Sequence, residues 1–157
     1  MRGFEFDVTR KRRKSHCPIH FALAVFGDAW SLLIVRDLMF KRRASYGEFL
    51  RAEERIATNI LADRLSRLQA EGVIWRAPGG RYQLTSKGAD LLPILLEMIR
   101  WSARYDPRTA ADPGFVRRLY KDRTALERDL RGTFPVASGS AARRGARKRD
   151  LHKGGTT

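Results

Sequence analysis

The sequence predicts one mainly α-helical domain that carries a single small β-hairpin. Hydrophobic residues make up 43% of the 157-residue chain, which is enough for one packed interior. Apolar side chains recur at three- and four-residue spacing over several segments, a pattern typical of helices packed on a core. Only residues 73–84 combine two short β-prone runs with a Pro-Gly-Gly turn, which indicates a hairpin.

Positive charge dominates the chain and gathers at its ends. The net charge is +15, of which residues 1–16 carry +4 and residues 132–157 carry +5. We predict a flexible basic arm over 1–16 and a disordered basic tail over 132–157, because neither segment has apolar residues to offset its ordering entropy. The sequence pI of about 11.1 favours a polyanionic partner, most often nucleic acid and less often an anionic membrane face.

Several protein classes are excluded by composition. Cys17 is the single cysteine, so no intramolecular disulfide forms, and no Cys/His set has zinc-site spacing. No apolar run reaches the length of a membrane span or a signal peptide. We expect a soluble cytoplasmic protein without metal or cofactor. The three histidines form no catalytic set with the carboxylates and no Gly-rich phosphate loop is present, so we expect no enzyme.

The first half of the domain reads as helices. A helix is expected over 18–26, with Pro18 in its first turn and Gly27 as its end. Asp28 is expected to cap a buried helix that runs to about residue 40. A basic cluster at the end of that helix complements the helix dipole or contacts phosphate, and both roles remain open. The cluster consists of Lys41, Arg42 and Arg43.

A helix-turn-helix is expected next. A helix of about two turns follows Ser45, and a strongly amphipathic helix covers 58–71 with Leu61, Leu65 and Leu68 on one face. Two helices joined by a tight turn, the second with a polar outer face, are the layout of this motif.

The hairpin over 73–84 has one arginine on each side of its tip. Arg76 and Arg81 would reach a phosphate backbone if the hairpin lies beside the amphipathic helix. Exposed arginines are also ordinary in hairpins, so this reading stays one of two.

A long helix over 85–105, capped by Thr85 and interrupted at Pro93, carries two apolar stripes. One stripe covers the domain core, and the other needs a further surface, most simply a second copy of the chain. Alternatively, neighbouring helices of the same chain cover both. A last helix over 113–131 is expected to pack on the long helix or its dimer mate. The stripe that we assign to the dimer interface consists of Leu91, Leu95, Met98, Ser102 and Tyr105.

This order of elements is a winged helix-turn-helix, and specific motifs resemble the HxlR family of bacterial transcriptional regulators, relatives of the MarR group. The resemblance covers about residues 17–105, and we treat 106–131 as a helical extension. It implies a homodimer that joins through its terminal helices and places its recognition helices in successive major grooves. The motifs are GDAWSLLIVRDL at 27–38, YGEF at 46–49, the amphipathic segment 56–68, EGVI at 71–74, YQLTSKG at 82–88 and 92–101 with its Leu-Pro-Ile-Leu and Trp101.

Base contacts are expected near the start of the recognition helix, on the face away from its leucines. Asn59 can pair bidentately with adenine, and the methyl groups of Thr58 and Ala62 can meet a thymine methyl. Asp63 can accept from cytosine, but we favour a pair with Arg67 one turn on. The family usually has Ser where this chain has Ala57, so we expect Thr58 to cap the helix instead.

Phosphate contacts are expected from arginines and lysines around this helix. Arg64 matches a family arginine that either contacts phosphate or braces the helix, and both remain open. The basic run at 10–14 is expected to act as a DNA-binding arm. The other backbone candidates are Arg67, Arg76, Arg81, Lys41, Arg42 and Arg43.

Cys17 occupies the position at which some members of the family sense oxidants or electrophiles. A helix N-terminus near Lys14 and His16 would stabilise its thiolate. A cysteine that merely packs is the alternative. An effector of redox or small-molecule type is therefore an expectation of the resemblance.

We therefore predict a sequence-specific dimeric regulator of transcription, a repressor, that binds a palindromic site on double-stranded bacterial DNA. The alternative is an architectural protein that binds nucleic acid without sequence preference, which the basic ends favour.

Overall fold

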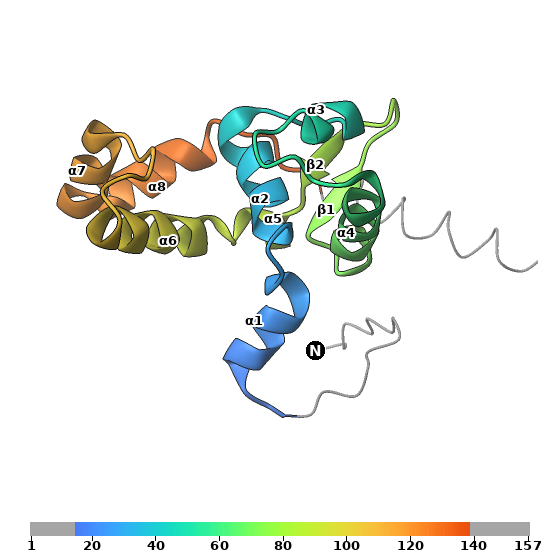
Figure 1. Cartoon of the computed structure of the whole chain (residues 1–157), viewed down its shortest axis with the longest axis horizontal. Coiled ribbons are helices and arrows are strands. Elements are labelled where there is room, and N and C mark those ends of the chain that lie inside the picture. The colour runs from blue at the N-terminus through green and yellow to red at the C-terminus, as the bar shows by residue number, and fades with distance from the viewer. Residues whose placement is uncertain (1–14, 139–157) are drawn as a thin grey trace, which may run out of the picture.

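A computed structural model describes residues 15–138, in which helices surround one two-stranded antiparallel hairpin (Figure 1). The predicted mainly helical class with a small hairpin is confirmed. The helix-turn-helix and the hairpin lie at one end of the body, and the last three helices lie at the other. The elements are α1 (Pro18–Phe26), α2 (Ser31–Arg36), η1 (Asp37–Lys41), α3 (Tyr46–Leu50), α4 (Thr58–Ala70), β1 (Ile74–Arg76), β2 (Tyr82–Leu84), α5 (Ser86–Ala89), α6 (Leu92–Tyr105), α7 (Pro113–Lys121) and α8 (Arg123–Arg131).

Helix α1 has the predicted bounds and projects from the body (Figure 1). It ends at Gly27, whose N–H donates to the Leu23 carbonyl at 2.8 Å. A Cβ at Gly27 would lie 2.4 Å from that oxygen, so only glycine fits there. Ile19 and Leu23 are 70% and 58% exposed, so α1 presents apolar surface that its own chain does not cover.

The predicted buried helix after Asp28 is confirmed as α2 and the single π-helical segment η1. The Asp28 carboxylate accepts from the N–H groups of Trp30 at 2.8 Å and Ser31 at 2.9 Å, as expected of a cap. Burial alone would raise the pKa of Asp28, but the hydrogen bonds from Ser31 and Trp30 hold it below its ordinary value. The core side of this element consists of Ile34, Val35, Leu38 and Met39.

A buried carboxylate, Asp37, joins this element to the chain that leads into α4. It pairs with Arg36 at 2.7 Å and with Arg43 at 3.3 Å. Arg36 also pairs with Glu54 in the turn before α4, and its hydrogen bond lowers the pKa of Glu54 to about 2. Because removal of one partner would leave a charge buried and unpaired, this cluster fixes the turn between α3 and α4.

The hairpin pairs Ile74 with Leu84 and Arg76 with Tyr82, and its tip is closed by Gly79 and Gly80 at φ of 87° and 83°. The outer edge of β2 is covered by other parts of the chain. The Tyr82 N–H donates to the Ala44 carbonyl at 2.6 Å, so the segment before α3 lies beside the strand.

The C-terminal segment covers the rest of that edge, which corrects the prediction of disorder from residue 132 onward. Val136 bridges to Leu84 in parallel, and the Ala137 N–H donates to the Leu84 carbonyl at 2.8 Å. Phe134 and Ala137 are buried. The apolar Phe134 and an edge carbonyl in need of a donor hold this segment, and both effects depend on tertiary contacts. Residues 139–157, like the arm at 1–14, lie outside the described residues.

The predicted interruption of the long helix is confirmed. Thr85 caps α5 by accepting from the Gly88 N–H at 3.1 Å, and α6 restarts with Pro93 in its first turn.

The prediction of one last helix over 113–131 is wrong, because the chain breaks at Asp122. This residue has φ of −151° and ψ of 76°, and its carboxylate accepts from the Ala125 N–H at 3.0 Å, which caps α8. The bend folds α7 and α8 against each other, and Leu119 and Leu126 are both buried. Burial of both leucines stabilises two short helices over one straight helix.

Among residues 15–138, no single helix is long and apolar enough to cross a membrane. Helix α1 and the α2–η1 segment meet that criterion only as a pair that is bent by 76°. The same residues contain no group of three metal-ligating side chains.

Helix α4 begins without a side-chain cap. Ala57 is the N-cap residue and Thr58 is the first helical residue, so the expectation that Thr58 caps the helix is wrong. Thr58 has entered the helix because its own carbonyl and that of Ala57 already accept within it, as in the 2.9 Å bond from the Leu61 N–H to Ala57.

We expect Ala57→Ser to stabilise the fold by about 0.5–1 kcal/mol, because a serine hydroxyl would accept from an N–H of the first turn. Thermal unfolding followed by circular dichroism measures this as a rise in Tm of roughly 2–4 °C. The control is Ala62→Ser at an exposed position inside the same helix, where serine should be neutral or slightly destabilising. Equal Tm changes in the two variants would contradict the uncapped start.

Candidate nucleic-acid interface

Helix α4 presents a polar face at the surface because its apolar face is fully committed to the core. Leu61, Leu65 and Leu68 are buried, and they hold the helix against α2, α3 and β1. The opposite face is open, and α4 lies at the outer end of the body beside the hairpin (Figure 1). The four predicted base-contact residues, Thr58, Asn59, Ala62 and Asp63, are all exposed.

The start of α4 is also held by α3. Tyr46 donates its phenolic hydrogen to the Thr58 carbonyl at 2.9 Å, which ties the two helices of the motif together. Helix α3 begins with a capping box, in which the Ser45 hydroxyl accepts from the Glu48 N–H at 3.3 Å. Backbone N–H groups of Ala44 and Ser45, each at 2.8 Å, lower the pKa of Glu48 to about 2. The turn is therefore rigid on both sides.

Arg64 braces the helix. Its guanidinium is partly buried and pairs with Asp28 at 3.2 Å and with Asp63 at 3.1 Å. Of the two roles left open by the sequence, these contacts favour bracing. The expected pair between Asp63 and Arg67 is wrong, because Asp63 turns toward Arg64 instead. Arg67 is exposed and has no carboxylate partner within residues 15–138, so its charge faces solvent.

The basic cluster after η1 divides into two parts. Lys41 and Arg42 are exposed, and Arg42 sits at the left-handed end of the helix with φ of 54°. Arg43 pairs with buried Asp37 and with Glu53 at 3.8 Å, so it is engaged in the fold. Within this cluster, Lys41 and Arg42 are the cations that remain for an external anion.

Both hairpin arginines are exposed, and each also has a contact within the fold. The Arg76 guanidinium lies 5.7 Å from the centre of the Tyr82 ring, and Arg81 lies 3.5 Å from Glu48. These contacts hold the arginines near the strands without burying them. The exposed face of α4 thus has cations on the hairpin and in its own second turn, an arrangement that suits a polar groove between two phosphate strands.

The predicted dimer stripe is only partly at the surface. Leu91 and Leu95 are buried in the chain's own core, so they offer little area to a partner. Met98 and Tyr105 are 49% and 62% exposed, and Ser102 is half-buried. Trp101, which sequence reasoning left outside the stripe, is 66% exposed. Its position one turn from Met98 and from Tyr105 is a signal that the heptad-like stripe obscured.

The position of Cys17 is the N-cap of α1, where its thiol is free and exposed. It lies next to the apolar residues of α1, at the end of the chain that projects from the body (Figure 1). The position is compatible with a reactive role and does not establish one.

Comparison with known proteins identifies relatives over the same region. The pattern of the HxlR-like helix-turn-helix family matches residues 25–110. YdzF of Bacillus subtilis, an uncharacterized HTH-type transcriptional regulator, is 30% identical over 95 residues, which cover 57% of this chain and 87% of that protein. Rv3095 of Mycobacterium tuberculosis, of the same description, is 32% identical over 98 residues, covering 59% of this chain and 61% of that protein.

Two solved structures share the fold. PA1607, a proposed transcription factor, superposes with a TM-score of 0.54 and 38% identity, over 62% of this chain and 72% of that one. Quinone-bound YodB of Bacillus subtilis superposes with a TM-score of 0.50 and 28% identity, over 57% of this chain and 99% of that one. The motifs, the uncovered polar face of α4 and these relatives agree: the chain belongs to the HxlR-like helix-turn-helix family and is an HTH-type transcriptional regulator, not an enzyme.

Proposed function

We propose that this regulator binds a short inverted repeat in bacterial DNA as a homodimer and represses a neighbouring gene from the cytoplasm. The observation that carries the proposal is the division of α4 into a leucine face buried in the core and an exposed face with Thr58, Asn59 and Ala62 near its N-terminus. A helix presented in this way fits the major groove with its first two turns toward the base edges.

Asn59 supplies sequence preference and Arg67 supplies affinity in this proposal. Asn59 has an amide that matches the adenine edge, while unpaired Arg67 lies two turns further along, where the helix leaves the groove. The cations of the hairpin and of the α2–α3 connection contact phosphates on either side. Lys41, Arg42, Arg76 and Arg81 fill this role.

We expect Asn59→Ala to weaken binding to the intergenic DNA beside the protein's own gene by on the order of tenfold, with loss of preference over a scrambled duplex. Arg67→Gln should weaken binding to both duplexes and reduce the slope of log K against log salt by about 0.9. Gel-shift titrations near 150 mM salt measure both effects.

The matched control for these titrations is Arg117→Gln, an exposed arginine on α7 at the far end of the body. It removes the same charge as Arg67→Gln and should leave the salt slope unchanged. Equal affinity of the unaltered protein for both duplexes would favour the architectural alternative. A loss in Arg117→Gln as large as in Arg67→Gln would show that only overall charge matters.

The proposed dimer rests on apolar surface that one chain leaves open at its two terminal elements. Ile19 and Leu23 on α1, together with Met98, Trp101 and Tyr105 on α6, are large side chains at or above 49% exposure. Such residues are rarely grouped on the surface of a monomer, and a second copy would remove them from water. Their burial at both ends agrees with a dimer that forms through terminal helices.

We expect the unaltered protein to sediment at twice its 18.0 kDa chain mass and Met98→Glu to shift it toward the monomer. A carboxylate introduced at the centre of the apolar surface would be desolvated in the interface without a partner. Thr124→Glu on the exposed side of α8 adds the same charge and should remain dimeric. Sedimentation of both variants as dimers would exclude this surface as the interface.

Response to an electrophile through Cys17 is a second proposal, which the quinone-bound structure of YodB and the exposed position of this thiol support. We expect benzoquinone to release the protein from its DNA site by alkylating the thiolate. Gel shifts with and without benzoquinone measure the release. Cys17→Ser should bind DNA normally and stay bound in the presence of the quinone, whereas release of Cys17→Ser would place the reactive group elsewhere.

A further inference from the structure

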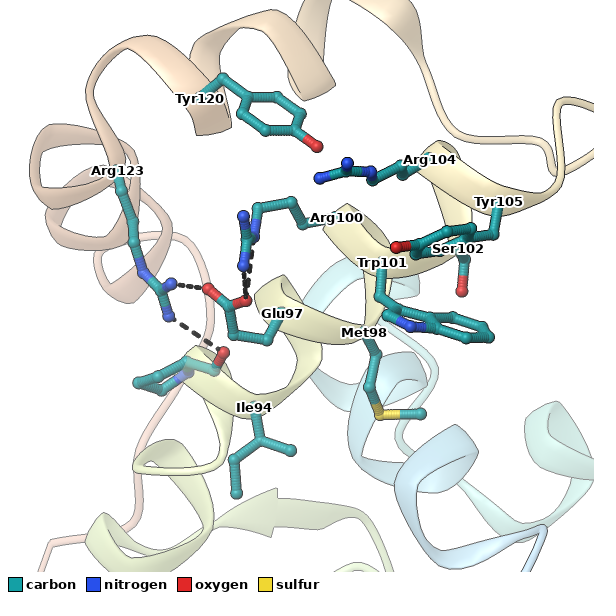
Figure 2. Close-up of a pocket in the computed structure, with 11 residues that line it drawn as sticks. Ile94, Glu97, Met98, Arg100, Trp101, Ser102, Arg104, Tyr105, Tyr120 and Arg123 are labelled. Atoms are coloured by element: carbon teal, nitrogen blue, oxygen red, sulfur yellow. Dashed lines mark hydrogen bonds and ion pairs between the residues drawn. The ribbon is translucent and has the colours of Figure 1, made fainter.

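A hollow of about 660 Å³ lies between α6 and α7, at the end of the body away from the hairpin (Figure 2). Its volume falls within the range of about 300–1,000 Å³ that is usual for small-molecule sites. One wall comes from α7, which lies beyond the residues matched by the family pattern. The hollow is therefore built by the C-terminal extension of this chain.

Aromatic rings line the hollow on two sides. Trp101 and Tyr105 lie on α6 with ring centres 5.2 Å apart, and Tyr120 faces them from α7 (Figure 2). All three rings are more than half exposed, although the side chains are large and mostly apolar. Ring faces held in this way are suited to stack against a flat ligand.

Positive charge is the second property of the lining. Arg100, Arg104 and Arg123 line the hollow with a single carboxylate, that of Glu97, so its formal charge is +2. Glu97 is already engaged, because it pairs with Arg123 and with Arg100 at 2.8 Å.

Arg104 has no carboxylate partner within residues 15–138, and its nearest printed contact is the Tyr105 ring, 5.6 Å from the guanidinium carbon. Figure 2 shows that the guanidinium of Arg104 and the hydroxyl of Tyr120 point into the same space. A guanidinium and a phenolic hydroxyl together offer donors for a carboxylate.

We propose that this hollow binds a small aromatic carboxylate, with the carboxylate between Arg104 and Tyr120 and the ring against Trp101 and Tyr105. A neutral hydrocarbon would leave the charge of +2 uncompensated, and a polyphosphate would gain nothing from three rings. A second copy of this chain placed over the hollow by a two-fold axis would bring like-charged arginines together, so charge complementarity favours an anion as the occupant.

The test is isothermal titration of the full-length protein with 2-naphthoate, and with 2-naphthamide as its neutral counterpart. We expect saturable binding of the carboxylate with a Kd below about 1 mM and binding of the amide at least several-fold weaker. Arg104→Gln should weaken naphthoate on the order of tenfold and leave the amide unchanged, while Trp101→Ala should weaken both.

Arg117→Gln is the matched control, because it removes one charge from α7 outside the hollow. Thermal melts of the variants exclude unfolding as the cause of a loss. The proposal is overturned if the unaltered protein shows no saturable binding, if amide and carboxylate bind equally, or if Arg117→Gln loses as much affinity as Arg104→Gln. DNA binding through α4 is measured separately, so failure here leaves the proposed function standing.

Discussion

The burial of three leucines on one face of α4 is the constraint on which the rest of the structure depends. Leu61, Leu65 and Leu68 lie at helical spacing, so packing them on the core leaves the opposite face with no choice but the surface. Two polar contacts then set the rotation and start of the helix: the pair between Arg64 and Asp28, and the hydrogen bond from Tyr46 to the Thr58 carbonyl. Removal of the leucine contacts would release every residue proposed to touch DNA.

Local patterns were sufficient to predict the parts of the fold that local chemistry determines. The amphipathic period of α4, the Pro-Gly-Gly turn and the caps at Asp28 and Thr85 each act within a few residues, and each element appears where it was expected. Three expectations failed where distant contacts decide. The break at Asp122 allows two leucines to be buried, residues 133–138 are held by the edge of β2, and Ala57 begins a helix that packing already stabilises.

The candidate site was predicted in composition more than in its pairings. Exposure of the α4 face follows from its period, but the partner of each charge depends on which carboxylate the fold brings near. Arg64 and Arg43 are held by Asp28 and Asp37, which precede them by many residues or lie on another element. The hollow between α6 and α7 was missed for the same reason, because its rings and arginines meet only when α7 folds back on α6.

The most direct test of the central claim is DNA cleavage by an iron chelate tethered to α4. In a Cys17→Ser background, Ala62→Cys carries the chelate on the exposed face, and Arg128→Cys on α8 is the control site. We expect the chelate at position 62 to cut a bound site in two clusters about one helical turn apart, with none from position 128. Cleavage from position 128 but not from 62 would contradict the placement of α4 in the groove.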